Sequence, residues 1–350
     1  MHLHLRSLCW AGFLSLYGCQ MGGSSGQGTE NADGDGDGNG NGDGDGDGDG
    51  KGDGDTDTGG GGGDGGVEPA GNDPNGVAQI YPTAPGKAPS WTLGFDDWEA
   101  RTRGWDGTVE GAGADTIVTD SGQVRLNVAA EDSDCEGEPD QGKALAQGYM
   151  CSPLDWYNLE MTGYIQLVEA AGGDDDRDWT WYLGGGRHTG DGPPDGCTGS
   201  AYKGNFHYAD GKARMRKESW HVNYSNREWK DVPGAPDYTQ ESDLWVGLKL
   251  VRYEFTRDGE RGLRLEQWAD LAGLGEDGTP ANQWVLINVE EDHPGAPSWG
   301  EQATDCGAPV DDQIMFWGGP FATYRWDDTT SRMRLMSVRA IVPPAAVAPP

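Results

Sequence analysis

The chain has 350 residues, of which 60 are glycine, and its formal net charge is −34. It carries 59 Asp and Glu residues against 25 Lys and Arg residues, and such a field repels nucleic acids and anionic membranes. Composition therefore excludes a nucleic acid as the partner.

Residues 1–19 are typical of an export signal. Arg6 gives a short basic region, and the apolar run that follows is too short to span a bilayer. The run ends in Leu16-Tyr17-Gly18-Cys19, which resembles the lipobox of bacterial lipoproteins. The resemblance implies a lipid anchor on Cys19, and Gln20 after it favours the outer membrane or cell surface. The alternative is a plain secreted protein that is cut nearby.

Four cysteines beyond the signal predict two disulfides in an exported chain, and three pairings are possible. They are Cys135, Cys151, Cys197 and Cys306. One of these pairings joins Cys135 to Cys151 as a local clip and Cys197 to Cys306 over a long range; the other two stay open. None of the four lies in a CxxC motif, so a zinc site is not expected.

Residues 20–90 predict a disordered tether. Asp-Gly repeats from Asp33 to Asp57, a glycine run and a Pro-rich stretch contain almost nothing to bury, so they cannot offset the entropy of ordering. The Asp-Gly array is similar to calcium-binding repeats. It lacks both the closing Glu of an EF-hand loop and the apolar position of calcium-binding β-helix repeats. A flexible spacer is therefore favoured over specific calcium binding.

Residues 91–342 predict one folded domain, followed by a Pro/Ala tail at 343–350. Several segments alternate apolar and polar residues between turn signals, as β-strands do. The apolar positions include Val124, Leu126, Val128, Leu159, Met161, Ile165, Leu167, Leu244, Val246, Leu248, Leu250, Leu263, Leu265, Val285, Ile287, Val289, Met333, Leu335 and Ile341. Many β segments without an amphipathic helix predict an all-β, jelly-roll β-sandwich.

Three segments resemble the later strands of the concanavalin A-like jelly-roll superfamily, which holds lectins, glucanases and polysaccharide lyases. They are Trp245-Val246-Gly247-Leu248-Lys249-Leu250, Arg264-Leu265-Glu266-Gln267-Trp268-Ala269-Asp270 and the stretch 332–341. The resemblance implies a sandwich fold and a carbohydrate partner. It is compatible with a structural calcium and requires no cofactor. These motifs mark fold and not activity.

The stretch 201–224 predicts a β-hairpin, because alternating segments flank Asp210-Gly211, a pair that supplies the positive φ angles of a two-residue turn. In that register His207 faces Arg214 across the hairpin. Alternation places one set of polar side chains on a single face: Lys203, Asn205, His207, Arg214, Arg216, Glu218, Trp220 and Tyr224. The opposite face is predicted to be the core side, with Tyr202, Phe206, Tyr208, Ala213 and Met215.

Strict alternation also puts Lys217 and His221 on the core side, whereas a bulge after Arg216 would move both across. Arg187 and His188 follow an aromatic strand and lie in a Gly-rich loop at its end. From there they reach either a cleft or the solvent, and solvent is the default for a loop.

A basic face on an acidic protein predicts an anionic ligand, and a uronate lyase has matching needs. Arg, Lys or Asn would hold the carboxylate, while His or Tyr would exchange protons. Tyr202-Lys203-Gly204 with Tyr208 resembles the Tyr-Phe-Lys-Ala-Gly-x-Tyr strand of jelly-roll alginate lyases. The predicted catalytic residues are His207, His221, Tyr224 and Arg187. The predicted substrate-binding residues are Lys203, Asn205, Arg216, Lys217, Glu218, Trp220 and His188.

Other functions remain open. A non-catalytic glycan-binding or adhesive module and a purely structural surface lipoprotein are the alternatives, and the basic face could instead lie solvated on a convex sheet. Hydrolysis ranks third, because the Glu-x-Asp-x-Glu strand of retaining glucanases is absent from the sequence. The molecule is expected to be a monomer.

Overall fold

The computed structural model describes residues 70–86, 90–93, 102–103, 107–110, 116–119, 123–130, 156–170, 177–185, 201–219, 223–241, 243–299, 314–316, 319, 321–327 and 329–347. The predicted signal, lipid anchor and disulfides lie outside these ranges. Within them, no helix has the length and apolar character needed to cross a membrane.

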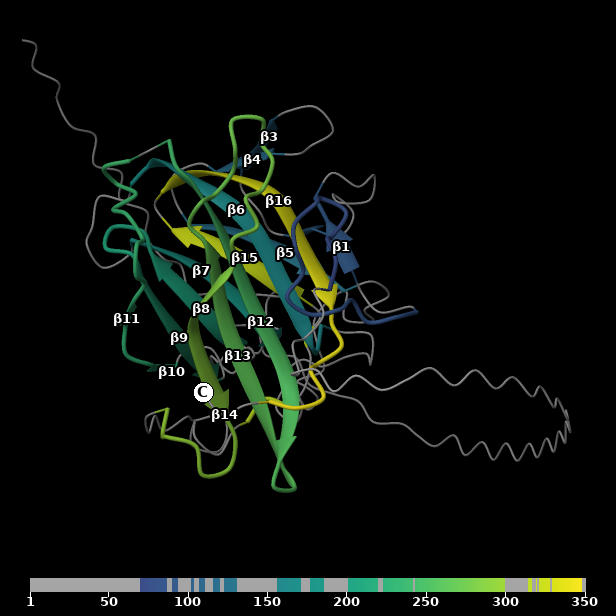
Figure 1. The fold of residues 1–350 in the computed structure, drawn as a ribbon. Coiled ribbons are helices and arrows are strands. Elements are labelled where there is room, and N and C mark those ends of the chain that lie inside the picture. Colours follow the sequence, from purple (N-terminus) through teal and green to yellow (C-terminus); the bar gives the residue numbers. More distant parts are fainter. Residues whose placement is uncertain are drawn as a thin grey trace, which may run out of the picture. The chain divides into compact units, whose positions relative to one another are not determined.

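The described elements are β-strands, and they form two antiparallel sheets (Figure 1). Sheet A runs in the order β14-β13-β12-β6-β16-β4-β3, with β1 also paired to β16. Its strands are β1 (Ser90–Thr92), β3 (Gly107–Glu110), β4 (Thr116–Thr119), β6 (Leu159–Glu169), β12 (Trp245–Arg257), β13 (Glu260–Asp270), β14 (Val285–Asp292) and β16 (Thr330–Ala340).

Sheet B runs in the order β10-β9-β8-β7-β15-β5-β2, with β11 also paired to β9. Its strands are β2 (Thr102–Arg103), β5 (Gln123–Ala129), β7 (Asp178–Gly185), β8 (Ala201–His207), β9 (Lys212–Ser219), β10 (Asn223–Asn226), β11 (Lys230–Asp231) and β15 (Phe321–Asp327). The expected all-β sandwich is confirmed.

Apolar side chains from the facing sides of both sheets form one buried core, as the alternation predicts. Leu159 and Met161 enter it from sheet A, while Leu126 and Val128 enter it from sheet B. Leu244 and Val285 are exposed and do not join the core. Leu335 also departs from its expected place. It has a φ of 52° beside a break in the register of β16, so Met336 takes the buried position there.

The two sheets approach closely at Gly204 in the middle of β8. A Cβ atom there would lie 2.6 Å from Cδ1 of Leu250 and 2.8 Å from Nε2 of Gln267, both on sheet A. Gln267 also donates a hydrogen bond of 3.1 Å to the carbonyl of Asn205. The absence of a side chain at 204 therefore allows the two layers to meet directly beneath the predicted polar face of β8.

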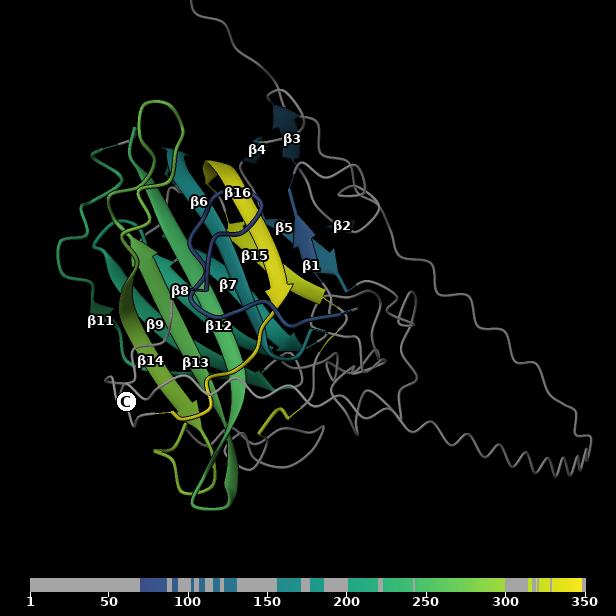
Figure 2. The ribbon, with the colours of Figure 1, turned by 45° about the vertical axis from the view of Figure 1, so that its right-hand side comes forward.

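Residues 70–86 pack across the outer face of sheet A; we call this segment the strap. Composition had placed it within the tether. Figure 2 shows the strap, in dark blue, crossing in front of β6 and β16. Ile80 and Tyr81 form a small second hydrophobic cluster with Val251 and Tyr253 of β12. The free energy gained by burying these two large side chains offsets the conformational entropy that is lost when the Gly- and Pro-rich flanks become ordered.

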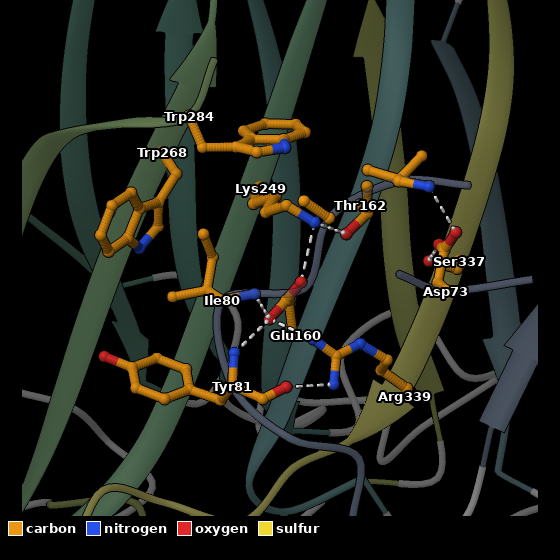
Figure 3. A network of polar contacts seen from close by, with 12 residues as sticks. Asp73, Ile80, Tyr81, Glu160, Thr162, Lys249, Trp268, Trp284, Ser337 and Arg339 are labelled. Carbon is orange, nitrogen blue, oxygen red and sulfur yellow. Dashed lines mark hydrogen bonds and ion pairs between the residues drawn. The ribbon is translucent and has the colours of Figure 1, made fainter. Parts of the chain in front are cut away.

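A buried carboxylate fastens the strap to sheet A (Figure 3). Glu160 accepts hydrogen bonds from the backbone N–H groups of Ile80, at 3.2 Å, and Tyr81, at 3.4 Å. It is ion-paired with Lys249 at 2.8 Å and with Arg339 at 2.5 Å. Arg339 in turn donates to the carbonyl of Tyr81 at 2.6 Å. The chain itself thus covers the middle of this face.

Candidate functional site

The hairpin of β8 and β9 has a different register from the one expected. His207 pairs with Lys212 and Lys203 with Arg216, so the strands are offset by two residues. The connection has four residues, Tyr208–Gly211, because the backbone of Tyr208 hydrogen-bonds to Arg177 and Tyr238 instead of to β9. Only Gly211 has a positive φ, of 61°, and a Cβ there would lie 2.6 Å from that of Ala235.

An offset of two residues leaves every side chain on its predicted face. Lys203, Asn205, Arg214 and Arg216 share the outer face of sheet B. The residues predicted for the opposite face are all in the core: Tyr202, Phe206, Tyr208, Ala213 and Met215. Alternation along the hairpin therefore predicted the face of each of these side chains correctly, although the predicted two-residue turn was wrong.

Neighbouring strands add residues to this outer face that sequence reasoning missed. Tyr182 of β7 lies opposite Lys203, and Thr323 of β15 lies opposite Tyr182. One row across the sheet thus reads Thr323, Tyr182, Lys203 and Arg216. The aromatic run 179–182 was visible in the sequence, but nothing there indicated which of its residues point outward beside the hairpin.

Tyr182 lies between two cations. Arg325 donates a hydrogen bond of 2.6 Å to its hydroxyl oxygen, and the ammonium of Lys203 lies 4.6 Å from the centre of its ring. Lys203 is also ion-paired with Glu218 at 2.6 Å, and these side chains are 2% and 0% exposed. Such burial strengthens electrostatic interactions because the local dielectric is low.

Arg216 differs from the cations around it. Its guanidinium makes no hydrogen bond or ion pair within the described part of the chain, and its Nε atom is buried. A buried polar group without a partner costs free energy. Arg216 is half-buried beside Lys203. Because Glu218 already neutralises Lys203, an incoming carboxylate would pair with Arg216.

His207 lies at the other end of the hairpin, four residues along β8 from Lys203, or about 13 Å at the usual rise of a strand. Its Nδ1 is 2.5 Å from a carboxylate oxygen of Asp210. Arg214 packs its guanidinium 4.0 Å from the ring centre of Trp229, which also contacts the imidazole of His207. His207 therefore does not reach Tyr182 or Lys203.

Lys217 does not join this face. β8 and β9 pair without a bulge, so Lys217 points into the sandwich beside Tyr202, where its ammonium lies 2.8 Å from Asp292. Tyr202 donates to the same carboxylate at 2.5 Å. Burial raises the pKa of Asp292. This cluster links the sheets and is separate from the outer face of sheet B.

The remaining predicted site residues lie outside the described ranges: Arg187, His188, Trp220 and His221. Tyr224 lies in β10 opposite Glu218, but its side chain is not described. The described part of the chain holds no group of three or more His, Cys, Asp or Glu able to ligate a metal ion. A structural calcium stays a prediction.

No family model and no curated protein matches the chain. Several solved structures are similar to it at low identity. A galectin-like protein of unknown function from Bacillus subtilis is 11% identical, with a TM-score of 0.39 over 76% of this chain and all of that one.

The exoplasmic/lumenal domain of VIP36, in its Ca2+/Man3GlcNAc-bound form, is 10% identical, with a TM-score of 0.35 over 73% of this chain and 90% of that one. Alginate lyase vAL-1 from Chlorella virus is 8% identical, with a TM-score of 0.31 over 71% and 98%. These similarities give no information about functional side chains. Any proposed function therefore has to rest on the contacts that this chain's own residues make.

Proposed function

We propose that this protein binds a uronate-containing polysaccharide on the outer face of sheet B and cleaves it by β-elimination. The observation that carries the proposal is the guanidinium of Arg216, which has no partner within the described part of the chain and lies in one row with Lys203 and Tyr182. A planar guanidinium matches a carboxylate through two parallel hydrogen bonds. A uronate carboxylate would therefore supply a partner that the described residues do not give Arg216.

β-Elimination needs a neutralised carboxylate, a base and an acid. The base takes the proton from C5, the electrons of that C–H bond form the C4–C5 double bond, and the C4–O bond breaks. An acid then returns a proton to the leaving oxygen. Arg216 provides positive charge for the carboxylate, whose charge spreads towards C5 in the transition state, and the pair of Lys203 and Glu218 lies beside it.

Tyr182 is the described side chain best placed to exchange these protons. Its hydroxyl oxygen accepts from Arg325, so the hydroxyl hydrogen points away from that guanidinium. The hydrogen bond also fixes the position of the hydroxyl, which favours proton transfer because geometry is set before the substrate arrives. Tyr182 is 3% exposed, so the polymer gains access only where this face opens.

Export and anchoring belong to the same proposal and rest on the sequence alone. The chain would be lipidated at Cys19 and displayed at the outer membrane or cell surface as a monomer. The Asp- and Gly-rich residues that follow would act as a spacer. Their charge would hold them extended, so the sandwich could reach a polymer some distance from the membrane.

A non-catalytic glycan-binding module is the second candidate. The observation that favours it is the pairing of Lys203 with Glu218 and of His207 with Asp210. Because these side chains are already paired, they can hold a ligand in place, but they are less available to take up or give a proton. Both candidates place the same ligand on the same face.

Incubation of the full chain with alginate, glucuronan or pectate separates the two candidates. A lyase produces the absorbance of an unsaturated uronate, and Arg216→Gln should abolish it. The matched control is Arg332→Gln, which removes an exposed arginine from sheet A and should leave activity unchanged. Retention on an immobilised uronan without any absorbance supports the binding module. If the protein neither cleaves nor is retained by any of the three polymers, both candidate functions are wrong.

A further inference from the structure

Cations occupy three successive outward positions of β9 on the outer face of sheet B, and the next outward position is Glu218. Arg216, Arg214 and Lys212 stand in one line along the strand, about 7 Å apart at the usual rise. Lys212, at the hairpin tip, is more exposed than Arg214. The side chain of Arg214 is 14% exposed and that of Lys212 is 37% exposed. The line thus runs from the solvent-exposed tip to the half-buried Arg216.

Arg214, the middle cation, is held by stacking. Its guanidinium lies 4.0 Å from the ring centre of Trp229, and among the described residues a carboxylate oxygen of Asp178 lies 3.9 Å away. That separation is too long for a hydrogen bond. Stacking on an aromatic ring orients a guanidinium while its N–H groups keep the capacity to bind an anion.

Lys212, at the tip, is paired with Asp210 at 2.6 Å, and both side chains are more than one third exposed. An ion pair that water reaches contributes little to stability. A polyanion can therefore displace Asp210 from Lys212 at small cost. The buried pair of Lys203 and Glu218 does not offer the same exchange.

We propose that Arg216, Arg214 and Lys212 form a track along β9 that binds a polyanionic glycan chain over several sugar residues. The glycan would contact the track first at the hairpin tip and would then lie along the strand as far as Arg216. A single uronate can neutralise one of these cations, whereas only a repeated anion can neutralise all three. This inference rests on the proposed function and adds to it that the ligand is a polymer held parallel to β9.

The test measures binding of size-fractionated alginate oligomers and intact alginate to the full chain by calorimetry, at low and moderate salt. Lys212→Gln and Arg214→Gln should each weaken binding of the polymer roughly three- to fivefold. Neither variant should change binding of a disaccharide. Arg216→Gln should weaken binding at every length. Arg332→Gln, on sheet A, is the matched control.

Two outcomes separate the track from the function on which it rests. If Lys212→Gln and Arg214→Gln bind polymer as tightly as Arg332→Gln does, while Arg216→Gln weakens binding, the track is overturned and the proposed function stands. If the unaltered protein binds no oligomer or polymer, both fall. Lys212 is exposed, so its variant should fold normally, and a melting curve of each variant checks this.

Discussion

Lys217 and Asp292 form an ion pair of 2.8 Å inside the sandwich, and the pair joins one sheet to the other. Lys217 belongs to β9 of sheet B, whereas Asp292 ends β14 of sheet A. Both side chains are buried. A buried pair of this kind is costly to break, because the remaining partner keeps its charge without solvent. The pair therefore sets the relative position of the two sheets at this end.

Replacing Lys217 alone should destabilise the fold strongly. Lys217→Met leaves Asp292 buried without its cation, and we expect a loss of about 3–5 kcal/mol in the free energy of unfolding. The double variant Lys217→Met/Asp292→Leu should recover most of it, since no charge remains to be desolvated. Urea unfolding at neutral pH measures both. A single variant as stable as the unaltered protein would contradict a structural role for the pair.

The carboxylate that holds the strap gives stability a defined dependence on pH. Burial acts to raise the pKa of Glu160, but the charges of Lys249 and Arg339 outweigh it and lower that pKa below its ordinary value. The group therefore stabilises the fold above the pKa it has in the unfolded chain. This contribution is lost as pH falls through the lower folded pKa. Glu160→Gln should thus unfold more easily at neutral pH and lose less stability on acidification. Urea midpoints from pH 7 to pH 3 test this, and parallel curves for the two proteins would exclude it.

Hydrogen exchange tests the strap itself. The amides of Ile80 and Tyr81 donate to Glu160, so Glu160→Gln should speed their exchange. The amide of Gln79 donates to the carbonyl of Gly71 within the strap and serves as the internal control. Faster exchange at all three amides would mean that the strap detaches as a unit, whereas no change at any of them would show that Glu160 does not hold it.

The hairpin shows what alternation can predict and where it stops. Side chains two residues apart share a face regardless of the turn, so Lys203 and Arg216 were placed on one face correctly. The turn was not predictable from Asp210-Gly211, because the backbone of Tyr208 pairs with Arg177 and Tyr238 and not with β9. These partners lie in other segments of the chain, and the ring of Tyr208 also contacts Trp179 of β7.

The missed residues share one physical reason. Tyr182 and Arg325 belong to strands that are far apart in the sequence and become neighbours only through the order of sheet B. A single sequence contains strand patterns but not strand order. The strap was missed because its Gly and Pro residues predict disorder, while Ile80 and Tyr81 gain enough packing to order the segment.

Gly204 should not tolerate a side chain. Gly204→Ala would place a Cβ atom 2.6 Å from Leu250, and we expect overpacking to cost about 1–3 kcal/mol. Leu250→Val shortens the opposing side chain. The double variant should therefore be more stable than the sum of the two single changes predicts. Thermal unfolding of all four proteins completes the cycle. Strict additivity would show that the layers move apart freely at this point.

Tyr182→Phe separates chemistry from binding on the outer face of sheet B. The variant keeps the ring beneath Lys203 but removes the hydroxyl that accepts from Arg325. If this hydroxyl exchanges protons, the rate of elimination should fall by at least about 100-fold, while affinity for the uronan stays close to that of the unaltered protein. Tyr157→Phe is the matched control, because it removes a half-buried hydroxyl that contacts Glu254 of sheet A. Initial rates of unsaturated-uronate formation and calorimetric affinities measure the two effects. Full activity in Tyr182→Phe would remove this residue from the reaction.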